Sequence, residues 1–322
     1  MNCQTDVFSD VLSSMRICGS LLLNEAYSPP WAISIPDADR LGVILRVAAG
    51  VRVVAFHLVE RGYMEISFTG ESASVVEAGE MVICFGGSSH QISQGLNPQI
   101  LPIELLVTGG QNPFRSESRA RSPSVVCVCG VFLLHDTHLN PLFAALPPLL
   151  HATVSQTGVF QNLSGVAELM AQEINRNAPG SSYMVERLLE LLCAEAVRSY
   201  INRIQPGQTG WLTALKDPIV SRALTMIHSQ PGADWSVKNL AQGVAMSPSR
   251  FAARFTASLG DSPMGYVSKW RMNVASRLLN STEKSITEIA ADVGYDSLAA
   301  FNRAFKRHLS LPPAAWRSRR CS

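Results

Sequence analysis

The sequence predicts an α+β protein of two domains: an N-terminal β-rich barrel with a helical extension, and a C-terminal all-α domain containing two helix-turn-helix units. The chain has 322 residues, more than one typical small domain needs. Short β-branched runs broken by Gly, Pro and Ser occupy the first part, as is typical of barrels and sandwiches. From about residue 140, apolar residues recur at three- and four-residue spacing, which indicates helices.

The charge differs between the two parts. Residues 211–322 contain 15 Lys and Arg against 7 Asp and Glu, whereas residues 1–210 contain 12 against 18. This asymmetry indicates that only the C-terminal part binds a polyanion. No apolar run is long enough for a bilayer, and the N-terminus lacks a basic segment followed by an apolar one. We therefore expect a soluble cytoplasmic protein with no membrane partner.

Strand-like runs are expected in the N-terminal domain at 42–47, 53–59, 80–85 and 123–134. The segment 111–122 contains Asn-Pro and three arginines and is expected to be an exposed loop.

A turn-rich segment, 141–150, precedes two expected helices at 163–175 and 183–201. The second helix is apolar on more than one side, so it can cover the barrel, form a dimer contact, or both. We expect a sensor and dimerisation domain over 1–204, β-rich to about 139 and helical over 140–204. A linker at 205–210 and a DNA-binding domain at 211–322 follow.

One helix-turn-helix pattern occurs twice, at 235–255 and 285–305. Each copy has a polar cap, a short helix, a small-residue turn and a second capped helix with Phe at i and i+4. Between them, 263–280 is expected to form one helix of roughly 27 Å, at about 1.5 Å per residue. That length suits two recognition helices about one DNA turn, roughly 34 Å, apart.

The periodicity of each recognition helix separates a core face from an outer face. Ser247 is the expected N-cap of the first helix, and Asp296 or Ser297 that of the second. Arg on the outer face can pair with guanine, Asn with adenine, and Lys with phosphate. The outer residues predicted to contact DNA are Ser249, Arg250, Ala253, Arg254, Leu298, Ala299, Asn302, Arg303 and Lys306.

The region from about Trp211 to Arg317 resembles the AraC/XylS family of bacterial transcription regulators. The matching residues are Leu240-Ala241, Met246-Ser247, Phe251, Phe255, Gly260, Pro263, Tyr266, Arg271, Ala275, Leu278-Leu279, Ile289-Ala290, Val293-Gly294-Tyr295, Phe301, Arg303, Phe305-Lys306 and Pro312. The resemblance implies a seven-helix double helix-turn-helix domain that binds promoter DNA. It also implies a second domain that senses a signal or dimerises.

Residues 56–62 and 79–90 resemble a degraded pair of cupin motifs. A cupin enzyme offers several histidines and a carboxylate to a metal, but only His57 and His90 remain here, with Val59 at the other histidine position. Two histidines make a poor metal site unless Glu or Cys completes it. We therefore expect no metal, no cofactor and no catalytic residue, and a cupin-like barrel whose His57 and His90 line a pocket for a small-molecule effector.

The seven cysteines include no CxxC pair and no Cys/His zinc spacing, so neither a zinc finger nor a disulfide framework is expected. Cys127 and Cys129 lie two apart in an expected strand and so point to one face. Their parallel side chains suit a disulfide poorly, and a partner on a neighbouring strand, such as Cys18 or Cys84, would fit better. Two interpretations stay open: inert core cysteines, or an oxidant sensor that uses Cys129 with Cys18 or Cys127.

Together these observations predict a homodimeric transcription regulator that binds promoter DNA, contacts RNA polymerase, and senses a small-molecule effector or an oxidant. Two alternatives belong to other classes. One is a metal-dependent cupin enzyme with a DNA-binding appendage, and the other is a DNA binder without signal response.

Overall fold

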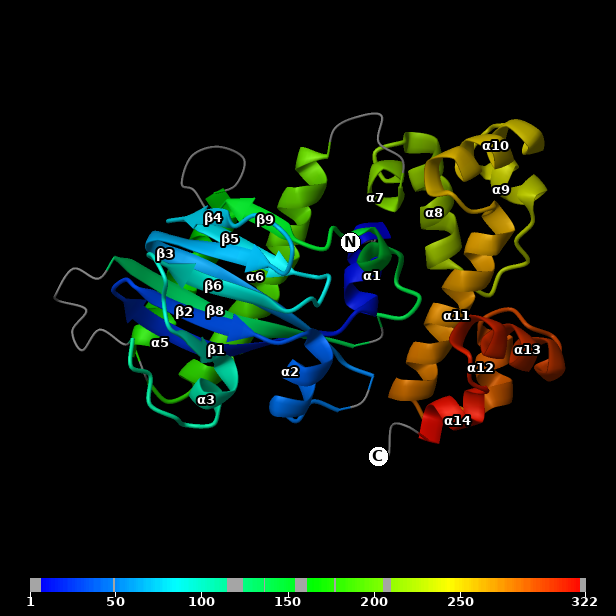
Figure 1. Ribbon diagram of the computed structural model, residues 1–322. Coiled ribbons are helices and arrows are strands. Elements are labelled where there is room, and N and C mark those ends of the chain that lie inside the picture. The colour runs from blue at the N-terminus through cyan, green and yellow to red at the C-terminus, as the bar shows by residue number, and fades with distance from the viewer. Residues whose placement is uncertain are drawn as a thin grey trace. The chain divides into compact units, whose positions relative to one another are not determined.

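The computed structural model describes residues 7–48, 50–114, 124–135, 137–153, 161–176, 178–204 and 210–318 (Figure 1). The chain forms two compact units. The sheet unit comprises Ile17–His135 and Leu146–Arg203, and the helical unit comprises Met1–Arg16, Asp136–Ala145 and Ile204–Ser322. The predicted linker lies outside the described residues except for Gly210.

The sheet unit is a curled half-barrel, as the sequence predicts. Its described strands are β1 (Ile17–Tyr27), β2 (Trp31–Ile35), β3 (Arg52–Phe68), β4 (Ser74–Glu77), β5 (Glu80–Cys84), β6 (His90–Gln94), β7 (Ile100–Pro102), β8 (Val125–Leu134) and β9 (Leu150–Thr153). The long strand β3 pairs with β5 and β8 along its first part and with β4 and β6 along its second. This strand therefore joins both halves of the curl.

Two helices pack together beside the sheet, α5 (Gln161–Arg176) and α6 (Ser181–Arg203), and α6 also contacts β1 and β9. The contact with β1 is close, because a Cβ on Gly19 would lie 2.2 Å from Leu189 Cβ. The covering role expected for 183–201 is therefore confirmed.

Two expected elements of the sheet unit were wrong. The run 42–47 is not a strand, because its first half belongs to α2 (Ala38–Ile44) and a turn follows at 45–46. The Asp37 side chain caps that helix by accepting a hydrogen bond from the Arg40 amide, and Leu41 is buried. The cap and this burial favour the helix more than the β-branched residues of 42–47 favour a strand. Strand β9 lies inside the region expected to be helical, where it pairs with β5. Within the expected loop 111–122, residues 115–122 lie outside the described part of the chain.

The helical unit contains the double helix-turn-helix domain. Its described helices are α1 (Val7–Ser14), α4 (Pro141–Ala145), α7 (Trp211–Ala214), α8 (Pro218–Ser229), α9 (Val237–Gly243), α10 (Pro248–Leu259), α11 (Pro263–Ser281), α12 (Ile286–Asp292), α13 (Leu298–Leu309) and α14 (Pro313–Ser318). The long central helix and both recognition helices, α10 and α13, begin where the sequence predicts. Ser247 and Ser297 are their N-caps.

Arg271, on α11, ties the two helix-turn-helix segments together. Its guanidinium donates to the carbonyl oxygens of Pro231 (2.9 Å) and Ala233 (2.7 Å) ahead of α9, and to that of Gly294 (3.1 Å) in the turn after α12. The same two segments meet at a pair of glycines. A Cβ on Gly232 would lie 2.4 Å from the Asp292 carbonyl oxygen, and Gly294 has φ +80°. Only glycine fits this approach without strain.

We predict that Arg271→Ala lowers the free energy of unfolding of the helical unit by about 3 kcal/mol. Hydrogen bonds from a charged donor contribute roughly 1.5–3 kcal/mol each, and water replaces part of them because Arg271 is only partly buried. Chemical denaturation followed by circular dichroism measures this. Arg303→Ala, on an exposed face, is the control and should change stability by less than about 0.5 kcal/mol. A loss below about 1 kcal/mol for Arg271→Ala would contradict the tying role.

Candidate nucleic-acid interface and the buried histidine–cysteine cluster

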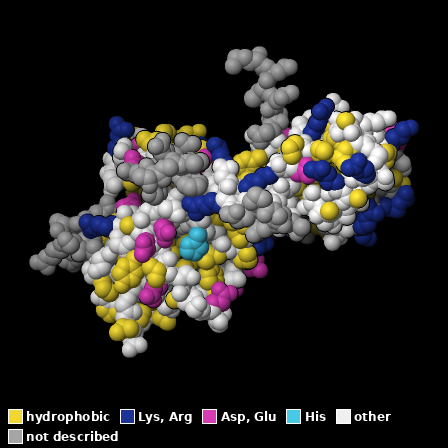
Figure 2. All heavy atoms as spheres, turned by 90° about the horizontal axis from the view of Figure 1, so that it is seen from above, with side chains coloured by type: hydrophobic (Ala, Val, Ile, Leu, Met, Phe, Trp, Pro, Cys, Tyr) yellow, Lys and Arg dark blue, Asp and Glu magenta, His cyan; other side chains and the backbone are white. Residues whose placement is uncertain are grey.

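The recognition helices bury one face and expose the other. Phe251 and Phe255 of α10, and Phe301 and Phe305 of α13, are fully buried. All nine residues predicted to contact DNA are exposed. Figure 2 shows many Lys and Arg side chains on the surface of the helical unit. The structure thus presents the predicted side chains to solvent, and their contact with DNA stays a prediction.

Helix α13 has the polar face expected of a groove-binding helix. Asn302, Arg303 and Lys306 are exposed along it, and its sequence contains no acidic residue. The last turn carries Lys306 and Arg307, whose positive charge complements the carboxyl end of the helix dipole.

The two arginines predicted on α10 differ in their surroundings. Arg254 Nε lies 2.8 Å from Asp217 Oδ2, and Asp217 also caps α8. Partial burial opposes ionisation of Asp217, but hydrogen bonds from Arg254 and from backbone amides lower its pKa below the usual value. No ion-pair partner of Arg250 is found among the described residues. Arg250 is therefore the better placed of the two to contact a base.

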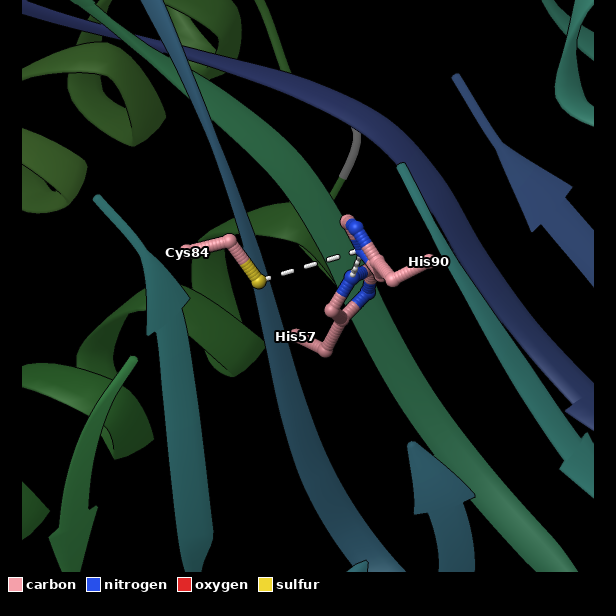
Figure 3. A group of neighbouring side chains, drawn as sticks. All are labelled: His57, Cys84 and His90. Carbon is pink, nitrogen blue, oxygen red and sulfur yellow. Dashed lines mark hydrogen bonds between the residues drawn. The ribbon is translucent and has the colours of Figure 1, made fainter. Parts of the chain in front are cut away.

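In the sheet unit, three side chains from three strands converge (Figure 3). His57 Nε2 of β3 lies 2.9 Å from His90 Nε2 of β6, and Cys84 Sγ, at the end of β5, lies 3.8 Å from the same His90 atom. All three residues are buried. Burial lowers the pKa of both histidines and raises the pKa of Cys84 to about 12. All three side chains are consequently neutral near pH 7.

The surroundings fix the proton positions on the two rings. His90 Nδ1 lies 3.1 Å from the Ser88 carbonyl oxygen, which can only accept, so His90 donates from Nδ1. The lone pair of neutral His90 then sits on Nε2, and His57 donates its Nε2 proton to it. His57 Nδ1 is buried without a hydrogen-bond partner within the described part of the chain.

A tight turn creates this convergence. Between Cys84 and His90 the chain reverses at Gly86 and Gly87, and Gly87 has φ +70°. A Cβ on Gly87 would lie 2.9 Å from Ala38 Cβ, so a side chain is excluded there. Cys84 was not predicted from the sequence as a member of this site. The available signal was a Cys-x5-His spacing across a Gly-Gly turn.

The expected effector pocket is small. The cavity beside His57 measures about 10 Å³ and is lined by apolar side chains and Cys129. That is space for about one water molecule. His90 borders a different feature, an open hollow of about 400 Å³ that Phe68 and Glu104 also line. The structure thus brings His57 and His90 into contact without placing them around one roomy pocket.

The candidate redox cysteines are not arranged as expected. Cys127 and Cys129 share the inner face of β8, where the hydrogen bond between the two thiols, and then burial, raise the pKa of Cys129. The strand register pairs Cys129 with Leu23 and Cys18 with Leu133, so Cys18 lies several residues along β1 from Cys129. Strand β3 separates β8 from β5, which carries Cys84. Neither Cys18 nor Cys84 is therefore the cross-strand partner that the sequence suggested.

Comparison with known proteins supports both parts of this description. A cupin family model matches residues 6–202, and a helix-turn-helix domain model matches residues 240–319. The regulator AlkR of Acinetobacter baylyi is 30% identical over 267 residues, 81% of this chain and 86% of that protein. A protein of Streptomyces lividans named as an AraC-like transcription regulator is 28% identical over 317 residues, 97% of this chain and 98% of that one.

Among solved structures, an AraC-type regulator from Chromobacterium violaceum is 27% identical and covers 34% of this chain and 97% of its own, with a TM-score of 0.33.

The fold, the two family models and the similarity to AlkR define an AraC-type DNA-binding transcription regulator. The chain belongs to the AraC/XylS family and carries a cupin domain at its N-terminal side. No helix among the described residues is long and apolar enough to cross a membrane.

We predict that Arg250→Ala weakens specific DNA binding about 10- to 100-fold, the range for loss of one bidentate base contact. Arg254→Ala should weaken it less, because Arg254 is held by Asp217. Electrophoretic mobility shift on the protein's own upstream DNA measures both. Arg40→Ala, which removes an exposed arginine from α2, is the control. An Arg254 effect larger than that of Arg250 would show that the ion pair opens on DNA.

Proposed function

We propose that the protein regulates a promoter by inserting α10 and α13 into two successive turns of the major groove. The observation that carries this proposal is the pair of recognition helices with buried aromatic faces and exposed polar faces, tied together by Arg271. The 19-residue helix α11 lies between them. Its length is about 28 Å at 1.5 Å per residue, close to one DNA turn.

The cupin domain would supply the signal. We assign sensing and dimerisation to residues 1–204 and DNA binding to 211–322, with RNA polymerase as the partner at the promoter. The cavity beside His57, about 10 Å³, favours a signal of atomic size or an oxidant over a sugar-sized effector. The two curated relatives described above are named as regulators, which supports a regulatory role over an enzymatic one.

Helix α6 supports the homodimer. It exposes Tyr183, Met184 and Leu191 while burying its other face within the sheet unit. Met184 and Leu191 are seven residues apart and so lie on one side of the helix. We place the dimer contact on this side of α6.

We predict that Leu191→Glu raises the dissociation constant of the dimer at least about tenfold, because a charge would replace an exposed apolar side chain that the dimer contact would bury. Sedimentation velocity over a concentration series measures the change. Leu105→Glu is the matched control, since Leu105 on α3 (Ile103–Val107) is 49% exposed and Leu191 is 48% exposed. Equal behaviour of the two variants would place the dimer contact elsewhere.

The central test is binding of the purified protein to its own upstream DNA, first reduced and then treated with mild oxidant. We expect binding at least about 1,000-fold tighter than to unrelated DNA. A change on oxidation that thiol reverses would support redox sensing, and serine variants at Cys18, Cys127 and Cys129 would locate it. Specific binding that is indifferent to oxidant would exclude the redox signal. Absence of specific binding would contradict promoter recognition at this DNA.

A further inference from the structure

We propose that His57, Cys84 and His90 form a binding site for one thiophilic divalent transition-metal ion, with zinc as the expected ion. From the sequence alone, the incomplete histidine set predicts no metal. The structure supplies the missing donor in Cys84. Binding of this ion does not depend on whether the ion controls transcription.

The donor atoms already lie near the separations that a metal requires. The two Nε2 atoms are 2.9 Å apart, Cys84 Sγ is 3.8 Å from His90 Nε2, and all three donors lie within 4.8 Å of one another. A tetrahedral zinc ion keeps two imidazole nitrogens roughly 3.3 Å apart, and a nitrogen and a thiolate sulfur roughly 3.6 Å apart. An ion would fit between the donors after adjustments of a few tenths of an ångström at these two contacts. Cys84 Sγ and the His57 nitrogen, which lie within 4.8 Å of each other, would also have to approach to about 3.6 Å.

The protonation states suit an ion. Neutral imidazole is the form that binds metals, and burial keeps both rings neutral. The Nδ1 proton of His90 donates to the Ser88 carbonyl and leaves Nε2 as the donor atom, which is the usual support for a metal-bound histidine. The proton on His57 moves from Nε2 to Nδ1, which has no partner within the described part of the chain. Cys84 releases its thiol proton to water as the metal–sulfur bond forms.

The donor set selects the class of ion. One thiolate and two imidazoles favour zinc or copper over magnesium and calcium, which prefer oxygen. A divalent ion with one thiolate leaves a net charge of +1 at the site. Three protein donors also leave a fourth coordination position, which water or an external ligand would fill.

The site would join three strands. His57 lies on the part of β3 that pairs with β5, Cys84 ends β5, and His90 begins β6, which pairs with the other part of β3. A bound ion would therefore hold together both halves of the curl and the Gly86-Gly87 turn between Cys84 and His90.

The test uses the full-length, tag-free, reduced and chelator-treated protein titrated with cobalt(II) chloride. We expect one ion per chain, a sulfur-to-cobalt charge-transfer band in the near ultraviolet, intense visible bands of tetrahedral cobalt, and displacement by zinc. Cys84→Ser should abolish the charge-transfer band and weaken binding at least about 100-fold, since loss of an outer-sphere partner alone costs 10- to 100-fold. The matched control is Cys193→Ser, because Cys193 on α6 is buried and its pKa is also raised to about 12.

Retention of the band in Cys84→Ser, or its absence from the wild-type chain, would overturn the proposal. Cobalt bound without a sulfur band would mean an ion held elsewhere. Circular dichroism checks that each variant folds. If Cys84→Ser does not fold, the site is tested instead with His90→Gln, by the change in Tm that zinc causes. Zinc should raise Tm in the wild type and in Cys193→Ser but not in His90→Gln, and an equal rise in all three would also overturn the site.

Discussion

The three hydrogen bonds from Arg271 are the interaction on which the DNA-binding geometry depends. Each helix-turn-helix segment has its own Ser cap and its own aromatic pair, so each could form by itself. Their mutual orientation needs a long-range tie, and α11 provides it through one guanidinium that spans carbonyl oxygens on both sides. The glycine pair at 232 and 294 then permits the backbones to approach. Spacing between α10 and α13 is consequently a property of this packing.

A comparable long-range constraint organises the sheet unit. Strand β3 is 17 residues long and pairs with strands of both halves of the curl, so its side chains meet residues far away in the sequence. His57 is opposite Cys129 on one side and Val82 on the other. The contact with His90 arises because β3 bends round to pair with β6. The buried polar cluster is thus a product of the sheet topology.

The sequence predicted those features whose determinants are local. Caps such as Ser247 and Ser297, together with Phe at i and i+4, locate the recognition helices, because capping and amphipathic spacing act over one or two turns. Residues 42–47 were misassigned because β-branched content was weighed above the cap at Asp37. Strand β9 was not predicted, because a run of four residues is too short to show the alternation of apolar and polar side chains that marks a strand. Cys84 and His90 come together only because the chain reverses between them. The neighbours of Cys129 are set by strand register, which cannot be derived from the spacing of residues in the sequence.

The glycines beside the candidate redox cysteines illustrate how packing changes an interpretation. Gly19 follows Cys18 and Gly130 follows Cys129 in the sequence, and a small neighbouring residue could leave a sulfur accessible. In the structure, Gly19 makes room for Leu189, and a Cβ on Gly130 would lie 2.7 Å from the Phe56 ring. Both glycines therefore serve close packing that shields the strands.

That shielding bears on which signal the cupin domain can receive. A thiolate is the nucleophile in reactions with oxidants, and burial keeps Cys84 and Cys193 as thiols by raising the pKa of each to about 12. The buried cysteines are for that reason slow to react unless something removes the proton. A metal ion at the His57–Cys84–His90 cluster would do so by binding the sulfur as thiolate. The metal ion and an oxidant would then both bind or react at the same atom, Cys84 Sγ. An oxidant response carried by Cys84 would consequently depend on the bound ion.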